Sequence, residues 1–340
     1  MKCILEKSRR LIRKQGVIAI ALVAGLGILG ACSSSDDEEA GFVPSTGPLA
    51  YNFDAKNAVT AAEIAAAAMS FFPGFTAVSQ VVIDRLLTDE PVNSPFDLML
   101  CNGSGDSILT WDDADRDTDL SIGDTASLQF TNCDFDTSGE TVTGTVDIDA
   151  TSVSVALPAV DVGYAASVDL TISLVPDTTD ITADFNARMS SPDGNSFTSV
   201  YTAADAPGKT LAVTENGTGY FTLGCFNVTQ TYDLAGLGAG TYNLDPAPLG
   251  AINASEKVFS LARGPVLSFI ADAFESGTQR LLSLSAPDCA SIGAPNGVPD
   301  SDGSYLDMIA LGGGNLMLRI FDVDNIETSS IPTTWDSLTN

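Results

Sequence analysis

The stretch "SVDLTISLVPDTTDITADFNARM", residues 167–189, decides the fold class of this 340-residue chain. Apolar side chains recur there at every second position: Val168, Leu170, Ile172, Leu174, Ile181, Ala183, Phe185, Ala187 and Met189. Successive side chains of a β-strand point to opposite faces of a sheet. This period therefore predicts strands with one apolar face and one wet face.

Strands of the same kind are expected along most of the chain after Leu98, where Thr, Val, Ser and Ile dominate and Gly, Pro, Asn and Asp interrupt them. The further segments are 197–203, 210–214, 219–232, 257–262, 266–274, 280–285, 305–311 and 315–323. Short turns such as "PDGN" at 192–195 and "ENGTG" at 215–219 favour antiparallel pairing of neighbours. The sequence predicts a mainly β fold, an antiparallel meander that forms an open barrel or a sandwich.

Helical patterns are confined to residues 54–88. An alanine-rich run ends at Pro73–Gly74, and a second run follows with apolar residues at three- and four-residue spacing, namely Val78, Val81, Val82, Leu86 and Leu87. Proline is typical of a helix end. We therefore expect two short N-terminal helices, packed on the sheet by their apolar faces.

The first 32 residues, "MKCILEKSRRLIRKQGVIAIALVAGLGILGAC", run from a basic segment through an apolar stretch to small residues and a cysteine. This layout is typical of a secretory signal, and its apolar stretch is too short for a helix that spans a membrane. The stretch "LGAC" at 29–32 resembles the lipobox of bacterial lipoproteins. That resemblance implies a signal peptide over 1–31 and a membrane anchor of acyl chains, such as palmitate, on Cys32.

The segment after Cys32 is polar, acidic and rich in Ser, Gly and Pro, so residues 32–50 are predicted to form a disordered tether. Residues 51–340 are expected to form a single elongated β-rich domain. Ser33 stands where an Asp would signal retention in the inner membrane, by analogy with enterobacterial lipoproteins. The sequence thus favours the outer membrane, on either its periplasmic or its surface face.

Charge and composition exclude several classes of function. Removal of residues 1–31 leaves nine basic residues against 43 acidic ones, a net charge of −34. Such a surface repels nucleic acid and favours cations. The chain has no histidine, so neither a Ser-His-Asp or Cys-His nucleophile nor a His-ligated zinc site can be built. We expect a protein that is not an enzyme.

Four cysteines remain once Cys3 leaves with the signal and Cys32 carries lipid, namely Cys101, Cys133, Cys225 and Cys289. An even number in an exported chain predicts two disulfides. Sequence alone allows three connectivities. We favour Cys101 with Cys133 and Cys225 with Cys289, because each pair brackets a compact segment.

The stretch "DADRDTDLSIGD", residues 113–124, has the spacing of a calcium loop. Its carboxylates fall at positions 1, 3, 5, 7 and 12 of twelve residues, namely Asp113, Asp115, Asp117, Asp119 and Asp124, and the apolar Leu120 stands at position 8. Thr118 departs from the pattern, since Gly normally makes the sharp turn there. The flanks read as strands, so we expect a structural calcium ion on a hairpin; a solvated acidic turn is the alternative.

The order of Cys101, the Asp-rich loop with "LSIGD", "LQFTNC" at 128–133 and "DVDNIETSSIPTTWDSL" at 322–338 resembles a set of uncharacterised lipoproteins from Gram-negative bacteria. The resemblance covers about a fifth of the chain and implies an envelope location. It implies no activity. In those lipoproteins a Gly usually stands where this chain has Thr118.

These observations predict a non-enzymatic outer-membrane lipoprotein with a binding or structural role in the cell envelope. Its expected partners are the membrane, through Cys32, and a protein or glycan that the sequence does not identify. One alternative is a carrier of lipid or another hydrophobic ligand, with a cavity between sheet and helices. A second alternative is a carboxylate-dependent polysaccharide hydrolase, because two acids at a suitable separation would suffice.

Overall fold

The computed structural model describes residues 49–50, 52–88, 95–135, 137–203, 210–245, 249–254, 257–262, 266–283 and 304–339. The predicted signal peptide and the lipid-bearing Cys32 lie outside these residues. The last two residues of the predicted tether form the short strand β1 (Leu49–Ala50), which pairs in parallel with β14 (Lys257–Ala262).

The first half of the chain builds an antiparallel sheet in which neighbours in sequence are neighbours in space. Its strands are β2 (Phe96–Asp97), β3 (Asp106–Asp112), β4 (Thr125–Cys133), β5 (Thr141–Ala156), β6 (Ala159–Leu174) and β7 (Asp177–Ser191). On β6 and β7 the alternating apolar residues face a core, except Leu174 at the end of β6, which is exposed, and the Ser, Thr, Asp and Asn residues between them face outward. The period-two pattern is thereby confirmed in both strands.

The sheet forks at β7, because residues 186–190 of this strand pair with β8 (Ser196–Thr202) and residues 179–183 pair with β9 (Thr210–Glu215). One arm continues through β8, β11 (Asn227–Asp233), β12 (Tyr242–Asp245), β15 (Leu267–Ile270) and β16 (Ala273–Ser276). The other continues through β9, β10 (Thr218–Gly224), β13 (Leu249–Ala254), β14, β17 (Thr278–Ser283), β18 (Tyr305–Gly312), β19 (Asn315–Phe321) and β20 (Glu327–Thr334).

The two arms approach each other again where β16 lies against β18. The mainly β, antiparallel character of the chain is therefore confirmed, whereas the open barrel and the sandwich are not. Two predicted strands were wrong in extent. The segment 219–232 is divided at Cys225, whose φ is 57°, and 266–274 is divided at Ala271 and Asp272, with φ of 50° and 60°.

A single helix, α3 (Ala58–Leu86, 29 residues), replaces the two helices expected from the sequence. It continues through Pro73, although an interior proline removes one backbone hydrogen bond and costs about 3 kcal/mol. Phe71, Phe72 and Phe75 around the proline are each at most 1% exposed. Burying one such side chain contributes about 1.5–3 kcal/mol, so packing of the continuous helix outweighs the local preference of proline.

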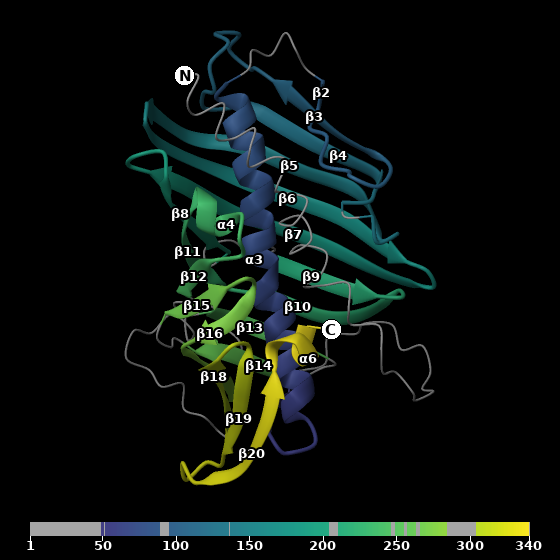
Figure 1. Ribbon diagram of the computed structural model, residues 1–340, viewed down its shortest axis with the longest axis vertical. Helices are drawn as coiled ribbons and strands as arrows, with labels where there is room; N and C mark the ends of the chain where they lie inside the picture. Colours follow the sequence, from purple (N-terminus) through teal and green to yellow (C-terminus); the bar gives the residue numbers. More distant parts are fainter. Residues whose placement is uncertain are drawn as a thin grey trace.

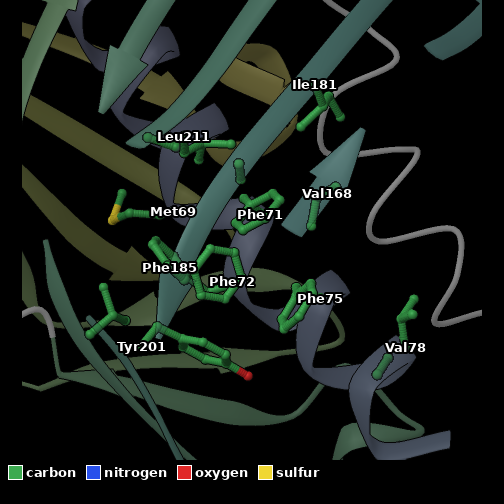
Figure 2. Close-up of a cluster of buried hydrophobic side chains, with 14 of the residues drawn as sticks. Met69, Phe71, Phe72, Phe75, Val78, Val168, Ile181, Phe185, Tyr201 and Leu211 are labelled. Carbon is green, nitrogen blue, oxygen red and sulfur yellow. The ribbon is translucent and has the colours of Figure 1, made fainter. Parts of the chain in front are cut away.

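Helix α3 lies lengthwise across one face of the sheet, with strands of both arms on either side of its lower half (Figure 1). Figure 2 shows Phe71, Phe72 and Phe75 together with Phe185 of β7 and Tyr201 of β8. The ring centroids of Phe75 and Phe185 are 4.8 Å apart in an edge-on arrangement. By length and composition α3 could cross a membrane, but 89% of its most apolar 18-residue window is buried inside the protein. This burial indicates a core helix.

Two short helices complete the described part of the chain. The four-residue α4 (Leu234–Leu237) follows β11, and α6 (Trp335–Thr339) follows β20 and contacts α3. The indole of Trp335 packs edge-on against Phe269 of β15 and Phe274 of β16. The C-terminal residues thus help to fill the core between the arms.

Candidate functional site

The acidic loop connects β3 to β4, which pair from Asp106 with Thr131 to Asp112 with Thr125. Both flanks are strands, as expected, so residues 113–124 form the loop of a hairpin. The C-terminal end of the loop also bonds to β5, because the Gly123 N–H donates to the Ala150 carbonyl over 2.9 Å. A paired strand on each side fixes the position of the loop on the sheet.

Three of the five predicted metal ligands lie together. One carboxylate oxygen from each of Asp113, Asp115 and Asp117 lies within 4.8 Å of the other two. Asp115 and Asp117 are exposed, and Asp113 is partly buried. Carboxylate oxygens at this spacing are the ligands that calcium prefers.

The other two predicted ligands do not belong to this group of three. Asp119 is exposed. Asp124 is 1% exposed, and its two oxygens accept hydrogen bonds from the backbone N–H of Ala114 (2.9 Å) and of Ser121 (2.8 Å). The Asp124 carboxylate therefore closes the base of the loop.

Backbone N–H groups also converge on Asp113, which accepts hydrogen bonds from Arg116 (2.6 Å) and Thr118 (3.0 Å). Desolvation acts to raise the pKa of Asp113, but the N–H groups of Thr118 and Arg116 outweigh it and the net pKa is lowered. Thr118 adopts φ of 72°, the left-handed conformation for which calcium loops use glycine at this position. Leu120 at position 8 is buried, as the calcium-loop pattern requires.

The disulfide between Cys101 and Cys133 is confirmed. It joins the chain before β3 to the end of β4, so it ties the end of the hairpin opposite the acidic loop. Cys225 is also disulfide-bonded. Its predicted partner Cys289 lies outside the described residues, so that pairing stays a prediction.

Sequence reasoning missed a polar network inside the core. Thr76, Ser79 and Gln80 of α3 are all fully buried, at 0% exposure. The Thr76 hydroxyl bonds to the Tyr201 hydroxyl and donates to Oε1 of Gln230 in β11 (2.6 Å). The sequence did contain a signal for this network. Thr76, Ser79 and Gln80 are spaced three and four residues apart on one helix face, and polar residues are rare in such a buried helix.

The same network reaches toward the C-terminal end of α3. The Tyr232 hydroxyl donates to Oε1 of Gln80 (3.0 Å), and Nε2 of Gln80 donates to Oδ1 of Asp84 (2.8 Å). Burial raises the pKa of Asp84 to about 6, against the opposing hydrogen bond from Gln80. Burial also raises the pKa of Tyr201 to about 12. At neutral pH the tyrosines are therefore uncharged, and Asp84 is the group of this network that titrates.

Comparisons with protein-family models, with curated proteins and with solved structures find no match to this chain. The resemblance to Gram-negative lipoproteins therefore stays a prediction from the motifs quoted above.

Proposed function

We propose that the protein is a non-enzymatic lipoprotein of the outer membrane, anchored through Cys32, with a calcium-stabilised hairpin and a binding or structural role in the cell envelope. The N-terminal sequence carries the proposed location. The approach of the Asp113, Asp115 and Asp117 oxygens to within 4.8 Å of one another carries the proposed calcium site. Three converging carboxylates, with the apolar Leu120 at position 8 of the loop, support calcium over a softer metal.

The electrostatics of the loop support a bound cation. Two carboxylates about 4 Å apart repel each other by about 1 kcal/mol in bulk water and by several times more near a protein surface. Three such pairs meet in this loop, and the basic residue among them, Arg116, is exposed. A divalent ion would turn this repulsion into attraction. An affinity of about 10⁻⁴ to 10⁻³ M would suffice in an extracellular calcium supply.

The geometry gives less support to a hydrophobic-ligand carrier. Such a carrier needs an unfilled space between helix and sheet, whereas the described side chains there pack ring against ring. Phe75, for example, contacts Phe185 at 4.8 Å and Tyr201 at 5.9 Å between ring centroids. A polysaccharide hydrolase would need two facing acids in an aromatic groove, and no contact in the described residues favours a particular pair.

The calcium site can be tested on the full-length chain in detergent. With a dissociation constant of about 10⁻³ to 10⁻⁴ M, 10 mM calcium should stabilise the fold by about 1.4–2.7 kcal/mol, which corresponds to a melting temperature about 2–5 °C higher than in chelator for a domain of about 290 residues. Terbium bound in the loop should luminesce on excitation of Trp111, at the end of β3 next to the loop. Asp115→Asn should weaken both signals.

Asp169→Asn is the matched control, because it removes the same charge from an exposed position on the outer face of β6. It should leave the calcium shift and the terbium signal as in the wild type. Equal melting temperatures with calcium and with chelator would exclude the proposed site. If Asp115→Asn and Asp169→Asn reduced the calcium shift and the terbium signal equally, the protein's response to calcium would depend on its net charge alone.

A further inference from the structure

Two polar atoms of the buried network have no hydrogen-bond partner among the described residues. They are the hydroxyl oxygen of Tyr164 in β6 and Nε2 of Gln230 in β11. Tyr164 is 1% exposed and Gln230 is 0% exposed, so bulk water does not reach either atom. Buried polar groups in folded proteins are almost always hydrogen-bonded, so both require a partner.

The two atoms belong to one cluster. Thr76 joins Gln230 to the Tyr201 hydroxyl. The Ser79 hydroxyl lies near the hydroxyls of Tyr201 and Tyr164 and acts against the larger effect of desolvation on the pKa of each. The Ser79 hydroxyl donates its one hydrogen to the Thr76 carbonyl over 3.1 Å, so it has none to donate to Tyr164. The cluster thus lies between α3 and the inner faces of β6, β8 and β11. Its sheet residues come from β6, which precedes the fork, and from β8 and β11, which belong to one arm.

Counting hydrogen atoms shows that rotating the Gln230 amide does not remove the problem. Thr76 has one hydroxyl hydrogen but two acceptors in range, the Phe72 carbonyl (2.8 Å) and Oε1 of Gln230 (2.6 Å). If Thr76 donates to Phe72, a rotated amide would donate to Thr76 and leave Oε1 without a partner in place of Nε2. One amide atom faces the cluster unbonded in either orientation.

We propose that this cluster binds internal water, which hydrogen-bonds the Tyr164 hydroxyl and the free atom of the Gln230 amide. Water both donates and accepts, so it suits either orientation of the amide. The hydroxyl and amide groups of the cluster are neutral, so they offer no charge to pair with an ion. The rings of Phe75 and Tyr164, 6.5 Å apart between centroids, and of Phe72 and Tyr201, 5.5 Å apart, favour the smallest polar ligand.

Oxygen-17 magnetic relaxation dispersion of the full-length protein would test this site, because it counts water molecules held inside a protein. The double variant Tyr164→Phe with Gln230→Leu removes both polar groups and should reduce the count by at least one. Tyr305→Phe is the control, since it also removes a tyrosine hydroxyl, but one that bonds to Asn325 at the β19–β20 turn. It should leave the count unchanged.

An unchanged count in a folded double variant would overturn the proposal. Should that variant fail to fold, a high-resolution crystal structure of the wild type gives the answer. Density of water size is expected within about 3.2 Å of Tyr164 Oη and of the Gln230 amide. Side chains of the protein satisfying both atoms, or density for a larger ligand, would contradict internal water.

Discussion

Asp84 ends the polar network of α3, and its raised pKa makes the stability of the protein depend on pH. The folded state binds the Asp84 proton more tightly than the unfolded chain does, because burial raises the pKa from 3.8 to about 6. The resulting stabilisation is complete below pH 3.8 and is lost as the pH rises through about 6. The ionised carboxylate therefore destabilises the fold at neutral pH.

Asp84→Asn should raise the free energy of unfolding at pH 8 by about 1–3 kcal/mol, since each pKa unit corresponds to 1.36 kcal/mol and the side chain is partly exposed. The gain should shrink to near zero at pH 4. Urea unfolding at both pH values measures it, with the outer-face variant Asp169→Asn as control. A difference from the wild type that stays constant between pH 4 and pH 8 would refute the role of Asp84.

Thr118 holds a left-handed backbone conformation, with φ of 72°, that disfavours a β-branched residue. Thr118→Gly should relieve about 1–2 kcal/mol of strain, against about 0.5–1 kcal/mol of added chain entropy in the unfolded state. A net gain of about 0.5–1 kcal/mol is expected in chelator, measured by urea unfolding. Thr110→Gly, in the exposed face of β3, should instead destabilise the protein. If Thr118→Gly and Thr110→Gly lowered the free energy of unfolding by similar amounts, backbone strain at Thr118 would be contradicted.

At the scale of elements, the β3–β4 hairpin is held by two different constraints at its ends. Asp124 closes the acidic loop through backbone hydrogen bonds at one end. The Cys101–Cys133 disulfide, with a sequence separation of 32 residues, closes the other end. The stability of the hairpin should therefore depend on the oxidised disulfide as well as on the hydrogen bonds of Asp124.

Replacing both cysteines, Cys101→Ala with Cys133→Ala, should lower the free energy of unfolding by about 3–4 kcal/mol, because the unfolded chain regains the entropy of an open loop of that size. Urea unfolding measures the loss. Wild-type protein treated with reductant is a second readout on the same bond. An unchanged midpoint in the double variant would show that the β3–β4 and β4–β5 pairing alone determines the stability of the hairpin.

At the scale of the whole molecule, α3 is packed as a core helix, because 89% of its most apolar window is buried inside the protein. Membrane attachment would then depend on the N-terminal segment. The proposed acyl anchor on Cys32 would hold a strongly acidic protein, which anionic headgroups repel, at a bilayer.

Cys32→Ala should abolish incorporation of labelled palmitate and move the protein from the membrane fraction to the soluble fraction. Cys225→Ala is the control, because it removes a cysteine that is disulfide-bonded within the domain. Palmitate labelling and fractionation of cells expressing each variant measure the effect. Membrane attachment that persists without Cys32 would exclude the lipoprotein anchor.

The candidate site was predictable in its residue types and only partly in its geometry. Spacing along the chain placed Asp113, Asp115 and Asp117 together, because alternate residues of a tight loop turn the same way. The role of Asp124 was not predictable, since its carboxylate is occupied by N–H groups that only the folded loop presents. The buried Thr76, Ser79 and Gln80 likewise needed partners on distant strands.

The sequence by itself determined the mainly β character, the antiparallel hairpins, the Cys101–Cys133 bond and the position of the acidic loop, because these follow from period, turn residues and spacing along the chain. Only the tertiary structure decided that α3 continues through Pro73, that the sheet forks at β7 and that a polar network lies in the core. The continuous helix and the polar network depend on burial against segments more than a hundred residues away, as in the bond from Thr76 to Gln230, which spans 154 positions. The fork depends on the pairing of one strand, β7, with both β8 and β9. The preferences of short stretches of sequence do not include interactions between segments so far apart in the chain.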